Sequence, residues 1–523
     1  MSMHSALSSV RTQRLLLLLC VSVPSFMINL DANIVAVSLP AIARSMHANF
    51  AAIEWVVSAY TLTFASLVLP AGALADRYGR KRILLLGLGI FTVASFLCGM
   101  APSIAVLNGA RALQGVGAAF QLSAALAILS EAFSGTERAA AFAFWGAVVG
   151  VAIAVGPVAG GIITQAFGWE WAFYINVAIG VGLILLALYA VTESADPDAG
   201  RLDFIGLISF GGGVFALTLA LISGNARGWS STQVLLALGC AAVLFAGFLV
   251  AEARQRKPMV DLHLFERPTF VGANIAALAF AMTLLTMLTY LPIFFQSALG
   301  FGPRDAGLLM LPLGVPLFIV PRLVAVHLAH RLSGRALLTV GLSLVTAGLI
   351  ALAAAVPLFN YEALVVGLVV AGIGGGVLNS EVVKVGMAVI PPERAGMASG
   401  VSGTVRFTGV VVGFAALGAV LAGRIQATLR PGVASFCQSV GDCHIDQSAL
   451  VRSVVAGDLS GPPGTLHNSL HAVALASFGE GFQAILVAAA AFAALSAVLT
   501  WVFVRGEDPA PVERNPGRFH RDP

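Results

Sequence analysis

Two charged residues stand inside apolar segments of this sequence. Asp31 lies about eight residues before the end of the apolar run 15–38, and Arg111 about seven residues after the start of the run 104–129, depths of roughly 12 and 10 Å in helices. A charge in hydrocarbon is costly and is by default a functional hypothesis. A nearby arginine favours an ionised acid, whereas burial favours the neutral form. Asp31 is therefore predicted to exchange a proton, with Arg111 orienting it; the alternative is a fixed brace between helices.

Other intramembrane charges have weaker patterns. Glu381 and Lys384 are three residues apart, which places them on one helix face. They either neutralise each other or pair across a cytoplasmic gate. Arg406 has no partner nearby in sequence and is predicted to face the protein interior. Glu54 stands beside Trp55 at the edge of an apolar run, and this position predicts a solvated interfacial carboxylate.

The composition indicates what must position these residues. The chain has 523 residues, of which 58% are hydrophobic and 10% are charged, against roughly 25% charged in soluble domains. This balance excludes an ordinary soluble domain, a coiled coil, collagen and a disordered chain. The apolar runs are long and continuous, unlike the short alternating strands of a membrane barrel. The sequence therefore predicts an all-α integral membrane protein.

Fourteen runs are long enough for spanning helices, which need about 20 apolar residues each. The first run passes Pro24 without a small-x-small cleavage site and is predicted to be an uncleaved span. An even number of spans places both termini on one side. The predicted spans are 15–38, 52–74, 83–100, 104–129, 139–163, 172–192, 204–224, 232–252, 269–294, 305–325, 336–356, 362–389, 396–422 and 479–504.

Basic residues predict the orientation. Of the 29 Lys and Arg residues, about 19 lie on the side of the termini and about six on the opposite side, so the positive-inside rule places both termini in the cytoplasm. The polar segment 423–478 then becomes a large extracytoplasmic loop of a multi-pass protein in the inner or plasma membrane. Within it, Cys437 and Cys443 form a local disulfide in an oxidising compartment, or remain two free thiols.

A short repeat suggests internal symmetry. The segment 74–80 (LADRYGR) resembles the segment 328–335 (LAHRLSGR), and each follows a predicted span. Two related six-helix halves are typical of transporters. We therefore expect an N-terminal half in 1–200, an inserted two-helix hairpin in 201–268, and a C-terminal half with a short cytoplasmic tail in 269–523.

Three glycine-containing motifs accompany these spans. Residues 72–82 form a predicted cytoplasmic turn with one acid and four bases, and residues 111–117 place the intramembrane arginine beside small residues. Residues 150–161 surround Pro157 with glycines, which allows a neighbouring helix to pack closely. Further characteristic stretches are Leu30–Pro40, Trp55–Tyr60, Ile175–Val177 and Tyr290–Pro292 with Gln296.

Together these motifs resemble the major facilitator superfamily, and specifically its fourteen-span drug:proton antiporters. The resemblance implies a secondary transporter that exports lipophilic or amphipathic organic compounds, such as drugs and toxic metabolites, in exchange for protons by alternating access. It implies proton coupling by Asp31 with Arg111. It also implies a cytoplasmic latch of Gly72, Asp76, Arg77, Gly79 and Arg80, and a hinge or seal of Gly150, Gly156, Pro157, Gly160 and Gly161. Glu170 between two tryptophans and Asn33 near Asp31 depart from the family pattern.

Polar, aromatic and methionine side chains within spans are candidates for a substrate cavity, with ordinary helix packing as the competing interpretation for each. They are Met27, Asn33, Tyr60, Gln114, Gln121, Trp145, Met287, Tyr290, Gln296 and Asn379.

The main alternative function is proton-coupled or facilitated transport of one specific solute, including uptake. An enzyme is disfavoured because no span carries metal-spaced ligands and no P-loop or soluble catalytic domain stands out. A sensor would need an output domain larger than the tail after Arg505. We expect no cofactor, a proton gradient as the energy source, no nucleic-acid partner and a monomer. The sequence does not indicate a periplasmic adaptor or the identity of the compound.

Overall fold

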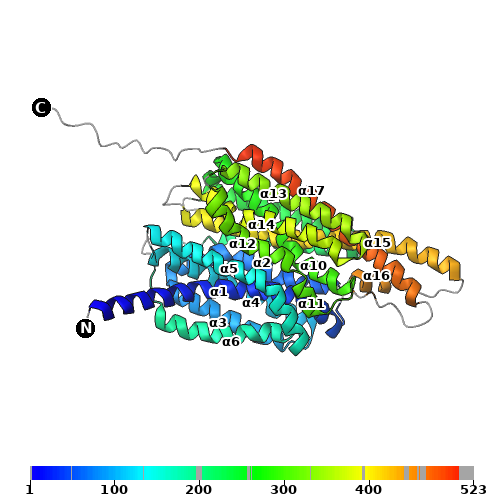
Figure 1. Ribbon diagram of the computed structural model, residues 1–523, viewed down its shortest axis with the longest axis horizontal. Helices are drawn as coiled ribbons and strands as arrows, with labels where there is room; N and C mark the ends of the chain where they lie inside the picture. Colours follow the sequence, from blue (N-terminus) through cyan, green and yellow to red (C-terminus); the bar gives the residue numbers. More distant parts are fainter. Residues whose placement is uncertain are drawn as a thin grey trace.

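The computed structural model describes residues 3–48, 50–133, 135–195, 203–255, 260, 262–329, 331–390, 395–440, 447–455, 457, 459 and 467–505. Every regular element in these ranges is a helix (Figure 1). Thirteen of the helices are long and apolar enough to cross a membrane, and a bent pair in α2 raises the number to fourteen. The all-α prediction is confirmed, and the predicted fourteen spans agree with the higher number.

The N-terminal six spans form one packed group. The second of them bends by 52° between Val68 and Pro70, because a proline within a helix removes a backbone donor and clashes with the preceding turn. The bent helix continues past the predicted end of its span. The six helices are α1 (Met3–Ser45), α2 (Phe50–Tyr78), α3 (Arg80–Gly99), α4 (Ile104–Ala132), α5 (Gly135–Phe167) and α6 (Trp171–Ala190).

A helical hairpin follows, formed by α7 (Phe204–Arg227) and α8 (Thr232–Arg254). Asp203 begins α7 by accepting a hydrogen bond from the Gly206 amide, and Gly228 ends it with a φ of 87° that favours glycine. The first hairpin helix contacts both α2 and α15, whereas α8 leaves many large apolar side chains exposed. The hairpin therefore lies on the periphery, where lipid surrounds α8.

The C-terminal half contains two spans assembled from short helical pieces. A π-helical turn, η2, joins α9 to α10, and the Thr286 hydroxyl donates to the carbonyl of Ala281 five residues earlier across that turn. The pieces are α9 (Pro268–Phe280), η2 (Ala281–Leu285), α10 (Thr286–Ser297), α11 (Pro303–Leu308), α12 (Leu311–Leu323) and η3 (Val324–Leu328). The remaining long helices are α13 (Gly334–Ala355), α14 (Tyr361–Ala388), α15 (Ala395–Val440) and α17 (His467–Phe503).

The segment predicted as a large loop, 423–478, is largely helical in its described part. Helix α15 continues to Val440, α16 occupies Gln447–Val455, and α17 already begins at His467, so these helices project beyond the rest of the bundle (Figure 1). Ile425, Leu429 and Val433 recur every fourth residue and are buried. Mean hydropathy misses such an amphipathic extension, because its exposed face is polar.

The first helix begins and the last helix ends at the same end of the bundle, opposite the projection formed by α15 and α16 (Figure 1). This arrangement agrees with an even number of crossings.

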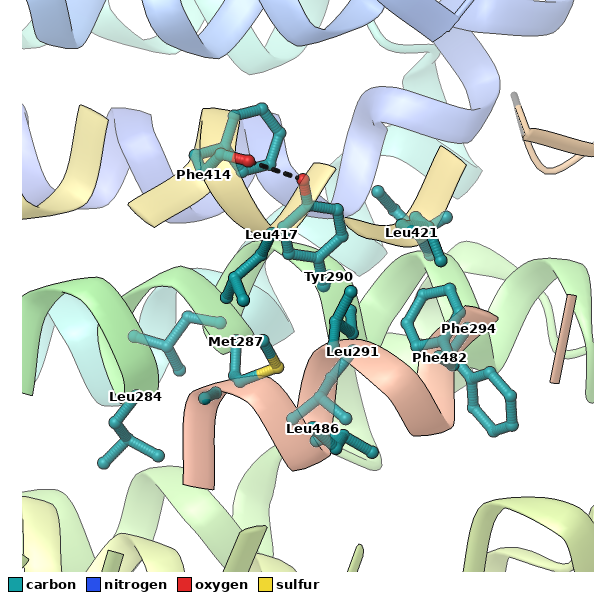
Figure 2. Close-up of a cluster of buried hydrophobic side chains, with 14 of the residues drawn as sticks. Leu284, Met287, Tyr290, Leu291, Phe294, Phe414, Leu417, Leu421, Phe482 and Leu486 are labelled. Atoms are coloured by element: carbon teal, nitrogen blue, oxygen red, sulfur yellow. Dashed lines mark hydrogen bonds between the residues drawn. The ribbon is translucent and has the colours of Figure 1, made fainter. Parts of the chain in front are cut away.

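Part of the C-terminal core lies where α10, α15 and α17 meet. Figure 2 shows Tyr290, Phe414 and Phe482 among leucines, with the Tyr290 hydroxyl donating to the carbonyl of Phe414 at 2.8 Å. The Tyr290 and Phe414 rings stack with centroids 4.8 Å apart. Since lipid is as apolar as these side chains, close packing and hydrogen bonds stabilise such a cluster more than hydrophobic transfer does.

Candidate functional site

Asp31 and Arg111 form an ion pair in the interior of the N-terminal half. Their side chains are 0% and 1% exposed, and Arg111 Nη1 donates to Asp31 Oδ2 at 2.6 Å. The pairing of α1 with α4 that matched depths predicted is therefore present. The mutual attraction of such a pair offsets the penalty of burying the two charges only when further hydrogen bonds satisfy both groups.

Two amides complete the hydrogen bonds of the acid. Asp31 Oδ1 accepts from Gln114 Nε2 at 3.0 Å and from Asn176 Nδ2 at 2.7 Å. Gln114 Nε2 also donates to the Ser95 hydroxyl at 2.8 Å. Five helices thus contribute to one network. Helices α1, α3, α4 and α6 contribute side chains, and α2 contributes the backbone carbonyl of Val56.

Arg111 is held on several sides. Its Nε donates to the Val56 carbonyl of α2 at 2.9 Å, and its Nη1 also donates to Gln114 Oε1 at 2.6 Å. The guanidinium lies 4.2 Å from the centre of the Tyr60 ring, a cation–π contact. If Asp31 takes up a proton, Arg111 loses its counter-charge but keeps the Val56 carbonyl and Gln114 Oε1 as hydrogen-bond acceptors.

Local sequence explains this geometry. Arg111 and Gln114 are three residues apart and therefore share a face of α4. Gly115 lets α2 approach, because a Cβ there would stand 2.3 Å from the carbonyl oxygen of Tyr60. The small residues that follow the arginine therefore bring the Val56 carbonyl within reach of its guanidinium.

Sequence reasoning assigned no role to Asn176 or Ser95, both of which are buried in the network. A signal for Asn176 exists, since it is the only amide side chain in the otherwise apolar helix α6. Ser95 gives no comparable signal, because serines occur in many spans without a polar partner from another helix.

The motif 72–82 lies at the junction of α2 and α3. Arg80 forms an ion pair with Asp76 at 2.9 Å and another with Glu131 of α4, and its backbone N–H donates to the Ser194 carbonyl. Gly79 has a φ of 111°, which favours glycine. All these partners belong to the N-terminal half. The predicted latch thus ties that half together, and residues 391–394, between α14 and α15, lie outside the described residues.

The glycine face of α5 lies between the two halves. A Cβ on Gly156 would meet Asn33, and one on Gly160 would stand 2.7 Å from the Ile34 Cα of α1. A Cβ on Gly161 would stand 2.3 Å from the Pro303 carbonyl of α11. Gly150 faces Phe318 of α12, and the Pro157 carbonyl lies against Gly307. The close packing predicted for this motif is confirmed, and it joins α5 to both halves.

Among described residues, the hydrogen bonds that join the two halves lie at the end opposite the termini. Gln296 Nε2 donates to the Val37 carbonyl at 2.8 Å, and the Arg304 N–H donates to Gln165 Oε1 at 3.1 Å. These contacts and the α5 packing close that end of the bundle. Nearer the other end, the rings of Phe64 and Phe407 pack edge to face, with their centroids 4.2 Å apart.

Charges in the C-terminal half have fewer partners. Lys384 Nζ lies 3.2 Å from Glu381 Oε2, so these residues pair with each other, with Glu381 buried and Lys384 exposed. Arg406 donates to Asn379 Oδ1 at 3.3 Å and lies 5.4 Å from the centre of the Phe280 ring. The interior orientation predicted for Arg406 is confirmed.

The prediction for Glu54 is wrong. Its side chain is buried, with 3% of the residue exposed, and its Oε1 has no hydrogen-bond partner among the described residues. Sequence placed it at the interface because it begins an apolar run, but α15, through Gly418, and α10, through Tyr290, pack over it from the other half. Gly418 of α15 makes this contact possible, since a Cβ there would stand 1.7 Å from Glu54 Oε1.

The predicted cavity residues divide into several groups. Gln114 belongs to the Asp31 network, and Tyr60 packs on Arg111. Trp145 donates to the Ser25 hydroxyl at 2.8 Å, and Gln121 is buried with both amide atoms unpartnered. The others are placed as follows: Asn33 donates to the Asn29 carbonyl, Gln296 joins the halves, Asn379 accepts from Arg406, Met27 is fully buried, and Met287 and Tyr290 lie in the packed core of Figure 2.

Cys437 near the end of α15 is disulfide-bonded. Its predicted partner Cys443 lies outside the described residues, so the pairing of these two cysteines stays a prediction.

Two helical halves that close against each other at one end, with a buried ion pair inside the N-terminal half, are typical of a multi-pass membrane transporter. The chain belongs to the Major Facilitator Superfamily, whose sequence profile matches residues 21–414. It is 37% identical over 502 residues to the multidrug resistance protein Stp of Mycobacterium tuberculosis, covering 94% of this chain and 92% of that protein.

Other known proteins agree with this family. The chain is 34% identical over 398 residues to the methylenomycin A resistance protein of Streptomyces coelicolor, covering 76% of this chain and 83% of that protein. Its fold resembles a crystal structure of a bacterial homolog of the human lysosomal transporter Spinster, in an inward-facing and unoccupied conformation. The TM-score is 0.62 at 17% identity, and the match covers 95% of this chain and 99% of that one.

Proposed function

We propose that this protein is a secondary active exporter that expels amphipathic organic compounds in exchange for protons, with Asp31 as the coupling acid and Arg111 as its partner. The observation that carries the proposal is the fully buried Asp31–Arg111 pair with its two amide donors. Proton-coupled export needs a group that changes charge inside the membrane, and the acid of this pair has the surroundings for that change.

The network supports a cycle of alternating access. Ionised Asp31 is stabilised by Arg111, Gln114 and Asn176, which all donate to it. Protonation removes the charge that holds α4 and α6 to α1, while Arg111 keeps two acceptors, one of them on α2. The relative positions of these helices therefore depend on the proton. The glycine face of α5 joins this half to α11 and α12, and we assign it the role of a seal between the halves.

Orientation follows from the distribution of basic residues. We place both termini in the cytoplasm, in the inner or plasma membrane, and the closed end of the bundle on the outside. Gly72, Asp76, Arg77, Gly79 and Arg80 are then on the cytoplasmic side, where we propose that they latch the halves in the outward-open state. Glu381 and Lys384 belong to the same side. The protein acts as a monomer.

The substrate class rests on two arguments. The relatives above are a multidrug resistance protein and a methylenomycin A resistance protein, which supports export of drug-like compounds. Buried amides with unpartnered atoms, such as Gln121, offer hydrogen bonds inside otherwise apolar helices, a combination suited to amphipathic molecules.

The test uses inverted membrane vesicles that contain the parent protein or Asp31→Asn. A panel of lipophilic and amphipathic compounds is added, and the release of protons and the uptake of the compound are recorded. We expect the parent to couple the two fluxes and Asp31→Asn to lose the coupling while still binding the compound. Glu137→Gln is the control, because this exposed acid of the same half pairs only with exposed Arg14 in the described structure.

If Asp31→Asn carries out coupled transport at the parent rate, Asp31 is not the coupling acid. Its role would then be that of a fixed brace between helices. Transport that runs in the opposite direction, or for a single solute without proton movement, would favour the specific-solute alternative.

A further inference from the structure

Glu54 is a second buried acid, and it lies between the two halves. It stands on α2, near the closed end of the bundle, and faces Gly418 of α15 and Tyr290 of α10. The Glu54 Oε1 and the Tyr290 hydroxyl oxygen stand 1.7 and 2.7 Å from the same point, the position of a Cβ on Gly418. Closure of this end therefore places the carboxyl group of one half against the backbone of the other.

Among the described residues, no cation and no hydrogen-bond donor compensates the Oε1 atom of this carboxyl group. The Tyr290 hydroxyl donates its hydrogen bond to the Phe414 carbonyl (Figure 2), so this hydroxyl does not donate to Glu54. Oε1 is buried without a hydrogen bond, and Glu54 makes no ion pair with a described residue. The neighbouring side chains are largely apolar, with Phe414 stacked on Tyr290 and Leu417 next along α15.

The cations on the helices packed around α2, at this end of the bundle, are engaged elsewhere or exposed. Arg111 binds Asp31, Arg424 of α15 binds Glu480, Arg227 of α7 donates to Gln233, and Arg44 at the end of α1 is exposed. The short helix α16 also contacts α2, and its Arg452 side chain is outside the described residues.

We propose that Glu54 is a proton-binding site of the outer gate, and that the gate closes only when Glu54 carries a proton. An ionised carboxylate buried without a counter-charge is expensive, whereas a neutral carboxyl group is tolerated. In the open state the site is hydrated and exchanges its proton with the external solution. One proton from external water converts the carboxylate to a carboxylic acid, and no covalent bond to carbon changes.

The proposal rests on the proposed function and adds a step to it. Asp31 lies inside one half, so its protonation acts on the packing within that half. Glu54 lies between the halves, so its protonation acts on their separation. External acid would therefore return the emptied transporter to its inward-facing state, which is the step that completes an export cycle.

The experiment measures the outer gate directly, without substrate. Spin labels are placed at exposed positions on the outer ends of the two halves, through Ala105→Cys on α4 and Asp305→Cys on α11. Cys240→Ser removes an exposed free thiol, while Cys20 and Cys98 are buried. Distances are recorded by electron–electron double resonance between pH 5.5 and pH 8.5, with the protein in lipid nanodiscs.

We expect the parent to shift from short to long distances as the pH rises. Glu54→Gln should keep the short distances at every pH, because its neutral amide allows closure without a proton. Gly418→Ala should have the opposite effect and increase the open population at least several-fold, since its methyl group collides with Glu54 and Tyr290 in the closed state. This second variant tests the geometry even if Glu54→Gln folds poorly.

Two matched controls isolate the effect. Gly403→Ala adds a methyl group to the same helix, α15, at a position where no described atom outside that helix lies within 4 Å. Glu362→Gln removes an exposed carboxylate at the same end of the bundle. Both should follow the parent titration.

A parent titration without a distance change, or a Glu54→Gln variant with the parent response, would overturn the proposal. Asp31→Asn separates this result from the proposed function. If Asp31→Asn keeps the pH-dependent change in label distance while losing coupled transport, the two acids act at different steps. If Asp31→Asn alone abolishes the gate response and Glu54→Gln does not, Asp31 controls the gate and the Glu54 proposal fails.

Discussion

Two acids buried in the same bundle have opposite surroundings. Asp31 accepts hydrogen bonds from Arg111, Gln114 and Asn176, all within one half. Glu54 has an unpartnered oxygen at a contact between the halves. Burial is nearly complete for both, so burial does not distinguish them. The difference lies in the donors: three side chains donate to Asp31, whereas no described donor reaches Oε1 of Glu54.

The comparison shows how one membrane bundle can hold two kinds of acid. An acid surrounded by donors is costly to remove, because each donor loses an acceptor. An acid without donors is costly to ionise, and its removal leaves no group unpaired. Stability measurements on matched amide variants therefore test the comparison independently of transport.

The largest effect is expected for Asp31→Asn. Breaking a buried ion pair by removing one partner costs about 3–5 kcal/mol, because the remaining charge is left uncompensated. Thermal unfolding in detergent measures this loss. The double variant Asp31→Asn with Arg111→Gln should recover much of the stability but not the coupled transport. Recovery of both would mean that the pair is only a brace.

Arg111→Lys keeps the charge and tests the geometry. A lysine ammonium cannot reproduce the fork that reaches Asp31, Gln114 and the Val56 carbonyl. Loss of two charged hydrogen bonds at about 1.5 kcal/mol each predicts a decrease of about 3 kcal/mol in the free energy of unfolding. If Arg111→Lys lowers the free energy of unfolding no more than the same substitution of an exposed arginine does, the positive charge alone maintains the network.

Asn176→Ala removes one donor to Asp31. We expect a loss of about 1.5 kcal/mol, since the deleted hydrogen bond ends on a charged group. The matched control is Gln121→Ala, which removes a buried amide whose two polar atoms have no partner. If both variants lose the same stability, the decrease reflects lost packing rather than the hydrogen bond to Asp31.

Glu54→Gln should have the smallest effect on stability at acidic pH. The amide replaces a neutral carboxyl group of nearly the same shape, and no described side chain loses a partner, so we expect a change within about 0.5 kcal/mol. The measurement is the same unfolding series at pH 5.5. A loss comparable to that of Asp31→Asn would show that Glu54 is ionised and paired, which would remove the contrast between the two acids.

Much of the architecture was predictable because hydropathy follows directly from residue type. The predicted spans correspond to helices throughout the chain, and the bend of α2 occurs at Pro70. The helical projection of α15 was not predictable from mean hydropathy, since Ile425, Leu429 and Val433 are separated by polar residues. Their burial depends on α16 and α17, which are distant in sequence.

The site residues likewise divide into those that the sequence predicted and those that only the structure revealed. Asp31 and Arg111 are conspicuous because charges are rare in apolar segments, and comparable depth in antiparallel spans predicted their pairing. Asn176 was missed because an amide in a span has several ordinary explanations, and only the packing of α6 against α1 brings it to the acid. Glu54 was misplaced because its sequence neighbours are those of an interfacial residue, whereas Gly418, which covers it, comes from the other half.

By itself the sequence determined that this protein is a helical membrane protein with an intramembrane acid and base, because charges are costly in hydrocarbon and are therefore rare and conspicuous in apolar segments. The expectation of a transporter came from motifs that resemble the major facilitator superfamily. Only the tertiary structure decided which amides surround Asp31, that Glu381 and Lys384 pair with each other, and that Glu54 is enclosed between the halves. These outcomes depend on contacts between helices far apart in the chain, and the environment of a carboxyl group is set by the atoms around it rather than by its neighbours in sequence.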